Sequence, residues 1–309
     1  MSAYVTAPGR ATVKRMIAAF HAAAARHGAR PGQATAQSWG WRGRTLSGPA
    51  HRDDGTVWIR LAASPADAVI ETFWYGNLTA EQHLESSLPR PRLLAFQEFT
   101  DDGWAYASEV FEHTQAMALS RRPALEQQPG HLGDTWWNDL KSTLAAVAPV
   151  STTRVTVYPR FATRVVSKMF GPTAPTIPDV DQWITSHGDL HWANLAGPDL
   201  TVFDWEGWGR APAGYDAATL LCHSLLCPEA ADQVRARFAD QLDTPAGQAG
   251  LALVLAEQLW QRQDYPNDPH VQAMQQLAAE CGWNTNVNSI SVMPTLGRPA
   301  TKNQGDRQE

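Results

Sequence analysis

The sequence is poor in cysteine, and it lacks the long apolar runs and the excess of positive charge that several protein classes need. Its three cysteines, Cys222, Cys227 and Cys281, have neither a metal-binding spacing nor the even number of a disulfide framework. No apolar run approaches the roughly eighteen residues of a membrane span, and the N-terminus has no signal-peptide core. A net charge of −6 argues against nucleic acid or an anionic membrane as partner. We therefore expect a cytoplasmic protein, and no protein partner is evident.

Lysine is scarce as well, since the 25 basic residues include only Lys14, Lys141, Lys168 and Lys302. No lysine lies between Lys14 and Lys141, so arginine is the only strong cation available in that part of the chain. A hydrophobic fraction of 43% nevertheless indicates a folded protein. Because 309 residues are long for one compact core, the length suggests two lobes or domains.

The most informative stretch, residues 186–195, reads Ser-His-Gly-Asp-Leu-His-Trp-Ala-Asn-Leu, and Val-Phe-Asp-Trp-Glu follows at 202–206. It contains a carboxylate at Asp189, an amide five residues later at Asn194, and a second carboxylate at Asp204. Phosphoryl transfer needs such a polar set, because catalysis depends on orienting the acceptor hydroxyl and neutralising phosphate charge through magnesium. Asp189 would accept the hydroxyl proton, and Asn194 and Asp204 would hold Mg²⁺. The alternative is a hairpin whose Asp and Asn only form turns and caps.

The run from His187 to Asn194, together with Asp204-Trp205-Glu206, resembles the aminoglycoside phosphotransferase and choline kinase-like family. In that family a His-Gly-Asp-Leu-His-x-x-Asn run replaces the His-Arg-Asp run of protein kinases. The resemblance implies an α+β, two-lobed protein-kinase-like fold, with a small antiparallel sheet in the N-terminal lobe and a mainly helical C-terminal lobe. It also implies ATP and Mg²⁺ as cofactors. It spans about residues 37–283 and is tight only over 187–216.

The resemblance implies further roles around this stretch. His187 would organise the catalytic loop from the core, and Asp216, at the start of a predicted helix, would support the same loop. Glu206 would touch a second Mg²⁺ or order its water, with a salt bridge at a strand end as an equal alternative. His191 would have the same loop-organising role as His187. Trp192 would shape the side of the site that binds the substrate.

A predicted strand near the N-terminus carries the nucleotide-binding cation. Periodicity predicts a helix over residues 12–27, a hairpin turn at 53–55 and a strand over 56–61. The run Val-Trp-Ile-Arg at 57–60 aligns with the Val-Ala-Ile-Lys run of kinases, with Arg60 in place of the lysine. Arg60 would meet phosphate oxygens and Trp58 would stack on the adenine, the alternative being an exposed strand arginine beside a surface tryptophan. No Gly-x-Gly-x-x-Gly phosphate loop is present.

Residues 65–88 are predicted to contain the helix that crosses behind the cleft, ended by prolines at 89 and 91. Kinases pair the strand cation with a glutamate of this helix. Glu81 is the favoured partner over Glu71 and Glu85, with a solvated helix-face charge as the alternative reading.

The sequence predicts two more strands, at 92–97 and 104–112, that complete the small sheet. The family resemblance implies that the second strand leads into a hinge at 109–112. There, backbone groups of Glu109 and Phe111 would pair with the adenine edge.

The predicted division is an N-terminal lobe over 1–108, the hinge, a helical C-terminal lobe over 113–283 and a flexible tail over 284–309. Helices are expected in the C-terminal lobe from near His113 and at 134–147, 155–170, 179–185, 230–242, 245–262 and 269–281.

The leading hypothesis is an ATP-dependent phosphotransferase that moves the terminal phosphoryl of ATP to a hydroxyl of a small molecule. A small acceptor is favoured over a protein, because Gly188 replaces the arginine with which protein kinases read activation-loop phosphate and no Ala-Pro-Glu follows Asp204. The alternative is a non-catalytic kinase-like protein that binds a nucleotide or metabolite, motivated by Arg60 and the missing glycine motif. The acceptor itself stays open among an antibiotic, a sugar, an amino alcohol and other metabolites.

Overall fold

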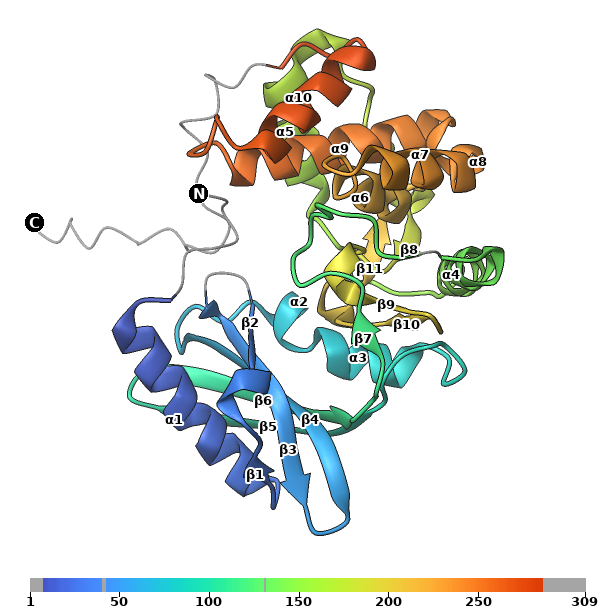
Figure 1. Ribbon diagram of the computed structural model, residues 1–309. Coiled ribbons are helices and arrows are strands. Elements are labelled where there is room, and N and C mark those ends of the chain that lie inside the picture. Colours follow the sequence, from blue (N-terminus) through green and yellow to red (C-terminus); the bar gives the residue numbers. More distant parts are fainter. Residues whose placement is uncertain (1–7, 41–42, 131, 286–309) are drawn as a thin grey trace, which may run out of the picture.

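The computed structural model describes residues 8–40, 43–130 and 132–285. An antiparallel sheet with one long helix forms one end of the molecule, and a group of helices forms the other (Figure 1). Two separate hydrophobic cores match these two ends. The predicted tail lies outside the described residues except for residues 284–285.

The N-terminal sheet has six strands, in the order β1-β3-β4-β6-β5 with β2 paired to β3, and every pair is antiparallel. The strands are β1 Arg30–Pro31, β2 Ser38–Trp39, β3 Thr45–Arg52, β4 Gly55–Pro65, β5 Leu93–Asp101 and β6 Trp104–Glu112. Helix α1 (Arg10–Arg26) lies along the sheet (Figure 1) and buries Met16 and Phe20 against it. The predicted helix at 12–27 and the hairpin turn at 53–55 are therefore confirmed.

Alternation along β4 directs its apolar residues into the smaller core. Val57, Ile59 and Leu61 are buried there, because successive side chains of a strand point to opposite faces. Arg60, on the other face, is also buried, with only 7% of its surface exposed. The alternative reading of an exposed strand arginine is therefore wrong.

The segment predicted as a hinge, 109–112, is the end of the central strand β6. Glu109 is in register with Arg60 of β4 on one side and with Phe96 of β5 on the other, and Phe111 is in register with Trp58 and Leu93. Sheet pairing occupies this backbone, because a central strand bonds to a neighbour on each side. The backbone of Glu109 and Phe111 is thus committed to the sheet, which corrects the prediction that it pairs with adenine.

Two short helices replace the single helix expected between 65 and 88. Helix α2 covers Glu71–Trp74 and α3 covers Gly76–His83, with the break at Tyr75. Ala80, Leu84 and Leu88 belong to the larger core with the C-terminal helices, so α3 packs against the C-terminal part of the molecule.

The C-terminal helices are α4 Asp134–Val147, α5 Pro159–Phe170, α6 Tyr215–Cys222, α7 Pro228–Arg237, α8 Ala239–Leu242, α9 Pro245–Gln261 and α10 Pro269–Glu280. Three predictions differ from this result. Residues 179–185 form a 3₁₀ turn at Val180–Gln182 followed by strand β8, and a strand, β7 (Met117–Ala118), rather than a helix follows His113. The predicted helix at 155–170 begins only at Pro159, because Val155 bridges to Arg210.

Small strands carry the catalytic stretch between the two ends of the molecule. Strands β10 (Thr201–Val202), β9 (Leu195–Gly197) and β7 form one sheet, and β11 (Gly209–Ala211) pairs with β8 (Ile184–Ser186) in another. The tryptophans beside them fill the larger core: Trp192, Trp136 and Trp137 are each at most 3% exposed. None of the helices in the described ranges is both long and apolar enough to cross a membrane.

Candidate active site

The hairpin formed by β9 and β10 brings the predicted metal ligands together. Asn194 directly precedes β9, and Asp204 follows β10 by two residues. Leu195 is the register partner of Val202, and the Phe203 N–H donates to the Asn194 carbonyl at 2.8 Å. The antiparallel pairing therefore places the two polar side chains at the same end of the hairpin.

Asp216 anchors the loop that carries Asp189, the predicted catalytic carboxylate. Its carboxylate accepts hydrogen bonds from the backbone N–H groups of His187 at 2.7 Å and Gly188 at 2.9 Å. Asp216 lies in the first turn of α6, where Gly214 is the N-cap, so it supports the loop rather than capping its own helix. Burial raises the pKa of Asp216, although the two backbone donors and His187 act in the opposite direction.

His187 ties the catalytic loop to the following loop from inside the core. It is fully buried, its Nε2 lies 2.9 Å from the Phe203 carbonyl oxygen, and its Nδ1 accepts from the Asp189 N–H at 3.2 Å. These partners assign the proton to Nε2. The predicted organising position of His187 matches these contacts.

Asp189 combines a restrained backbone with an accessible carboxylate. Its side chain is 47% exposed, its Oδ2 lies 3.4 Å from His191 Nε2, and its carbonyl accepts from Asn194 Nδ2 at 2.9 Å. Burial disfavours the charged form, but the neighbouring His191 outweighs it, so the pKa of Asp189 is lowered. An ionised, accessible carboxylate is what a proton acceptor requires.

Gly188 is required by the close approach of two loops. Its φ of +87° lies in the left-handed region, and a Cβ at this position would stand 2.3 Å from the Gly207 carbonyl oxygen. Packing therefore explains why a glycine stands where protein kinases have an arginine.

Asp204 has a backbone conformation that aims its side chain into the site. It has φ 55° and ψ 68°, which is uncommon for a residue other than glycine and concentrates at functional sites. Its Oδ1 is buried and has no hydrogen-bond partner among the described residues. Arg60 Nε approaches this oxygen at 3.6 Å without a hydrogen bond, and a buried carboxylate oxygen that accepts no hydrogen bond fits a hard cation such as Mg²⁺.

The protein side chains alone do not complete a metal site. Within the described ranges, no group of three or more histidine, cysteine, aspartate or glutamate side chains is arranged to hold a metal ion. Mg²⁺ is commonly held by one or two carboxylates together with phosphate oxygens and waters. One amide and two carboxylates are therefore enough ligands for the protein to supply.

Arg60 lies at the centre of three carboxylates. Its Nη1 donates to Glu109 at 2.8 Å, its Nη2 donates to Glu206, and its Nε lies 3.6 Å from Asp204 Oδ1. Burial lowers its affinity for a proton, but the three acids reverse this and raise the pKa of Arg60. Burial raises the pKa of Glu206 to about 7, an effect that Arg60 opposes and Asp204 strengthens. The cluster holds more negative than positive charge and is suited to receive a further cation.

The acidic partner of Arg60 is different from the one predicted. Glu81 instead binds Arg90 at 2.5 Å and also binds Arg92, and these arginines lower its pKa to about 2 against the effect of its burial. The partner from the N-terminal sheet is the side chain of Glu109, which is 1% exposed. The predicted role of Glu81 beside the cation is therefore wrong.

Sequence reasoning missed three residues that connect helix α3 with strand β6 and with the 205–208 segment. Asn77 donates to the Glu109 carboxylate at 3.1 Å. Trp208 Nε1 donates to the Gly76 carbonyl at 3.0 Å, and a Cβ at Gly76 would stand 2.0 Å from the Glu206 carbonyl oxygen. Only the glycine gave a signal in the sequence, because glycine within a helix often marks a close backbone approach.

The predicted position of Trp192 beside the substrate is also corrected. It is 1% exposed, it stacks on Trp136 at a centroid distance of 6.4 Å, and its Nε1 donates to Ser224 Oγ at 2.9 Å. Trp192 is a core residue. Trp58, by contrast, stays partly exposed on β4 two residues before Arg60.

Comparison with solved structures places this geometry in a known fold. The chain aligns with the crystal structure of aminoglycoside phosphotransferase APH(4)-Ia with a TM-score of 0.54 and 13% identity, over 89% of this chain and 99% of that one. The apo form of a thermostable mutant of APH(4)-Ia gives a TM-score of 0.51 and 14% identity, over 77% and 90% of the two chains. A microcompartment-associated aminopropanol kinase gives 0.42 and 15%, over 77% and 87%. No protein-family model and no curated protein matches the chain.

The likeness confirms the predicted fold. The chain has the α+β, protein-kinase-like fold of aminoglycoside phosphotransferases, with an antiparallel sheet in its N-terminal part and helices in its C-terminal part. The resemblance read from His187–Asn194 is thus matched by the architecture of the molecule.

Proposed function

We propose that the protein is a kinase of the aminoglycoside phosphotransferase and choline kinase-like family, and that it moves the terminal phosphoryl of ATP to a hydroxyl of a small molecule. One observation carries the proposal. Asp189, Asn194 and Asp204 converge on two adjoining loops, and Asp204 lies 3.6 Å from the buried cation of the N-terminal sheet. Phosphoryl transfer needs this combination of a base, metal ligands and a phosphate-binding cation.

Each of these residues has a defined task in the proposed reaction. The acceptor hydroxyl donates its proton to the Asp189 carboxylate as its oxygen attacks the terminal phosphorus in line, and the bond from that phosphorus to the β–γ bridging oxygen breaks to release ADP. Asn194 Oδ1 and the carboxylates of Asp204 and Glu206 would hold Mg²⁺, which would neutralise phosphate charge. Arg60 contacts phosphate oxygens, and Trp58 stacks on the adenine.

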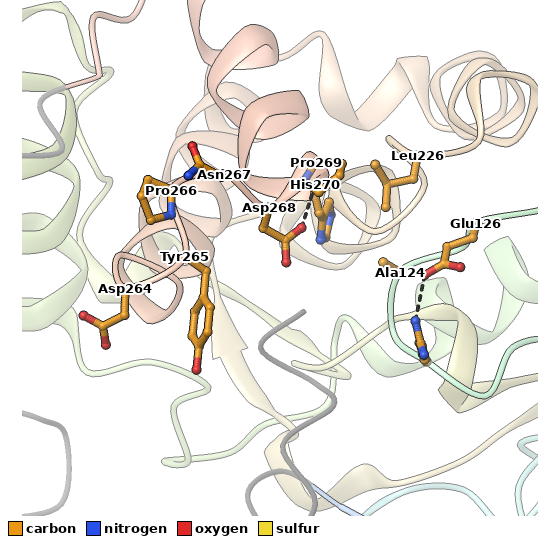
Figure 2. A pocket seen from close by; sticks show the side chains of 11 residues that line it. Ala124, Glu126, Leu226, Asp264, Tyr265, Pro266, Asn267, Asp268, Pro269 and His270 are labelled. Atoms are coloured by element: carbon orange, nitrogen blue, oxygen red, sulfur yellow. Dashed lines mark hydrogen bonds and ion pairs between the residues drawn. The ribbon is translucent and has the colours of Figure 1, made fainter. Parts of the chain in front are cut away.

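A pocket of about 460 Å³ lies between the start of α10 and the 122–126 segment. In Figure 2, Asp264 and Tyr265 lie on one side of it, Ala124 and Glu126 lie on the other, and His270 lies between them. The rings of His270, His223 and His191 follow one another at centroid distances of 5.5 Å, and His191 contacts Asp189. Two buried histidines, His223 and His191, therefore lie between this pocket and the proposed base.

A second candidate is a kinase-like protein that binds a nucleotide or metabolite without turnover. Arg60 favours it, because the guanidinium is engaged by Asp204 and Glu206, the carboxylates that would hold the metal. The accessible Asp189 and its contacts with Asn194 favour the active enzyme.

An ATP-consumption screen separates the two candidates. Wild type and Asp189→Ala are incubated with Mg²⁺-ATP and a panel of amine-bearing and neutral hydroxylated compounds, including aminoglycosides, amino alcohols and sugars. We expect at least one acceptor to drive ATP consumption by wild type, and loss of the base to reduce that rate by about 10²-fold or more. If wild type binds Mg²⁺-ATP while every acceptor leaves ATP unconsumed, the second candidate replaces the first.

A further inference from the structure

Arg60 and the carboxylate of Glu109 face each other on two neighbouring strands of the N-terminal sheet. Arg60 of β4 and Glu109 of β6 are direct register partners, and Nη1 and Oε2 are 2.8 Å apart. Both residues are buried, with 7% and 1% of their surfaces exposed. Side chains at opposed positions of an antiparallel pair are close by construction. The sheet itself therefore provides the counter-charge that kinases take from a helix.

Helix α3 contributes an amide where a carboxylate was expected. Asn77 is 4% exposed and its Nδ2 donates to the same Glu109 oxygen at 3.1 Å. The glutamate of this helix, Glu81, is one turn further along and binds Arg90 and Arg92. A buried carboxylate needs hydrogen-bond donors in addition to its ion-pair partner, and the Asn77 amide provides one for Glu109.

Glu109 also competes with the proposed metal ligands for the same guanidinium. Asp204 and Glu206 approach Arg60 through Nε and Nη2, while Glu109 holds Nη1 from the sheet side. With Glu109 neutralised, the attraction toward Asp204 and Glu206 is no longer balanced. The guanidinium would then be drawn to these carboxylates and away from a bound nucleotide.

We propose that Glu109 is the positioning residue of Arg60, with Asn77 fixing the Glu109 carboxylate, so that the acidic half of the nucleotide-binding pair has been transferred from helix α3 to strand β6. The inference rests on the proposed nucleotide-dependent function. It predicts that the carboxylate can be returned to the helix. A glutamate at position 77 is one methylene longer than the asparagine and would start from a side chain that already contacts the Arg60–Glu109 pair.

The test is the dissociation constant of Mg²⁺-ATP, measured by calorimetry on the full chain without an acceptor. Wild type is compared with Glu109→Gln, with the double variant Asn77→Glu/Glu109→Gln, and with Glu81→Gln as the matched control on the helix. We expect Glu109→Gln to weaken binding about tenfold or more, since it removes a charge-assisted hydrogen bond that orients Arg60. We expect the double variant to recover most of this loss and Glu81→Gln to bind as wild type does. Urea unfolding of all four proteins establishes that they are folded.

The outcomes distinguish this inference from the proposed function. Wild-type affinity in Glu109→Gln overturns the inference and leaves the kinase proposal intact. A folded double variant that binds no better than Glu109→Gln overturns the transfer of the carboxylate from helix to strand. A wild-type protein that does not bind Mg²⁺-ATP overturns the proposed function and this inference together.

Discussion

At the scale of single residues, the catalytic loop is held by hydrogen bonds from outside the loop. Asp216 accepts two backbone N–H groups of the loop, and His187 links the loop to the Phe203 carbonyl. None of these contacts touches the proposed substrates. They fix the backbone from which Asp189 projects, so that the proposed base needs little reorganisation during the reaction.

Replacing Asp216 with asparagine is expected to loosen this loop. An amide offers one oxygen to two N–H donors and turns its own donor toward the second, so a buried N–H is left without an acceptor. We expect the free energy of unfolding to fall by about 1–3 kcal/mol, measured by urea denaturation, and ATP turnover to fall with it. Asp232→Asn is the control, because this exposed carboxylate forms a surface ion pair with Arg235 at 3.3 Å, and such pairs contribute little to stability. Equal stability of the two variants would contradict the anchoring role.

At the scale of elements, helix α3 and the 205–208 segment act as one packed unit. The Trp208 indole donates to the Gly76 carbonyl and to Thr79 Oγ1, both at 3.0 Å. Gly76 at the start of α3 leaves room for the backbone of Glu206. The position of the proposed metal ligand Glu206 is therefore set by a helix more than 120 residues earlier in the chain.

The change Gly76→Ala tests this packing. The added methyl group would stand 2.0 Å from a backbone oxygen, so the helix and the loop must move apart. We expect a loss of unfolding free energy of about 1–3 kcal/mol, as for other overpacked sites, and weaker Mg²⁺-ATP binding.

Gly133→Ala is the matched control for this change, since a Cβ at Gly133 meets nothing within 4 Å and its φ of −70° suits alanine. Its expected cost is at most about 1 kcal/mol, for an altered N-cap. If the two alanine variants lose the same unfolding free energy, the close approach at Gly76 does not contribute to stability.

At the scale of the whole molecule, the larger core contains titratable groups whose charge depends on the fold. Burial raises the pKa of Glu257 on α9 to about 7, although the hydrogen bond from the Tyr215 hydroxyl at 2.8 Å lowers it. Burial lowers the pKa of His270 on α10 to about 4. Both groups are therefore neutral in the folded protein near pH 6, and both make stability depend on pH.

The sign for Glu257 follows from its raised pKa. The folded state keeps the proton between the ordinary value of 4.5 and about 7, whereas the unfolded chain loses it near 4.5. Its contribution to stability is therefore fully present below pH 4.5 and is lost as pH rises through 7.

We expect Glu257→Gln to remove this dependence, because glutamine stays neutral at every pH. Relative to wild type, the variant should gain about 1–3 kcal/mol of unfolding free energy between pH 5 and pH 8, measured by urea denaturation at both values. His270 is unchanged in the comparison, so its opposite pH dependence cancels. A stability difference that is constant with pH would show that Glu257 is not buried as a neutral group.

The sequence predicted local features well, because their causes are local. Alternation in residues 56–61 and the helical spacing of 12–27 specify which face is apolar, and β4 and α1 confirm both. The prediction failed where short segments depend on distant partners: residues 179–185 have no helix because β8 pairs with β11, and the pairing partner lies more than 20 residues away.

The sequence by itself determined the proposed set of catalytic groups. The spacing of Asp189, Asn194 and Asp204 lies within one loop and one hairpin, so neighbouring residues are enough to bring the three together. The tertiary structure alone decided which carboxylate serves Arg60. Glu109 is 49 residues away and meets Arg60 through strand register, while α3 places Asn77 beside the pair and Glu81, one turn further along, beside Arg90 and Arg92. Strand register and the position of a helix along its axis come from packing of the whole chain, and for this reason composition could not choose among the glutamates.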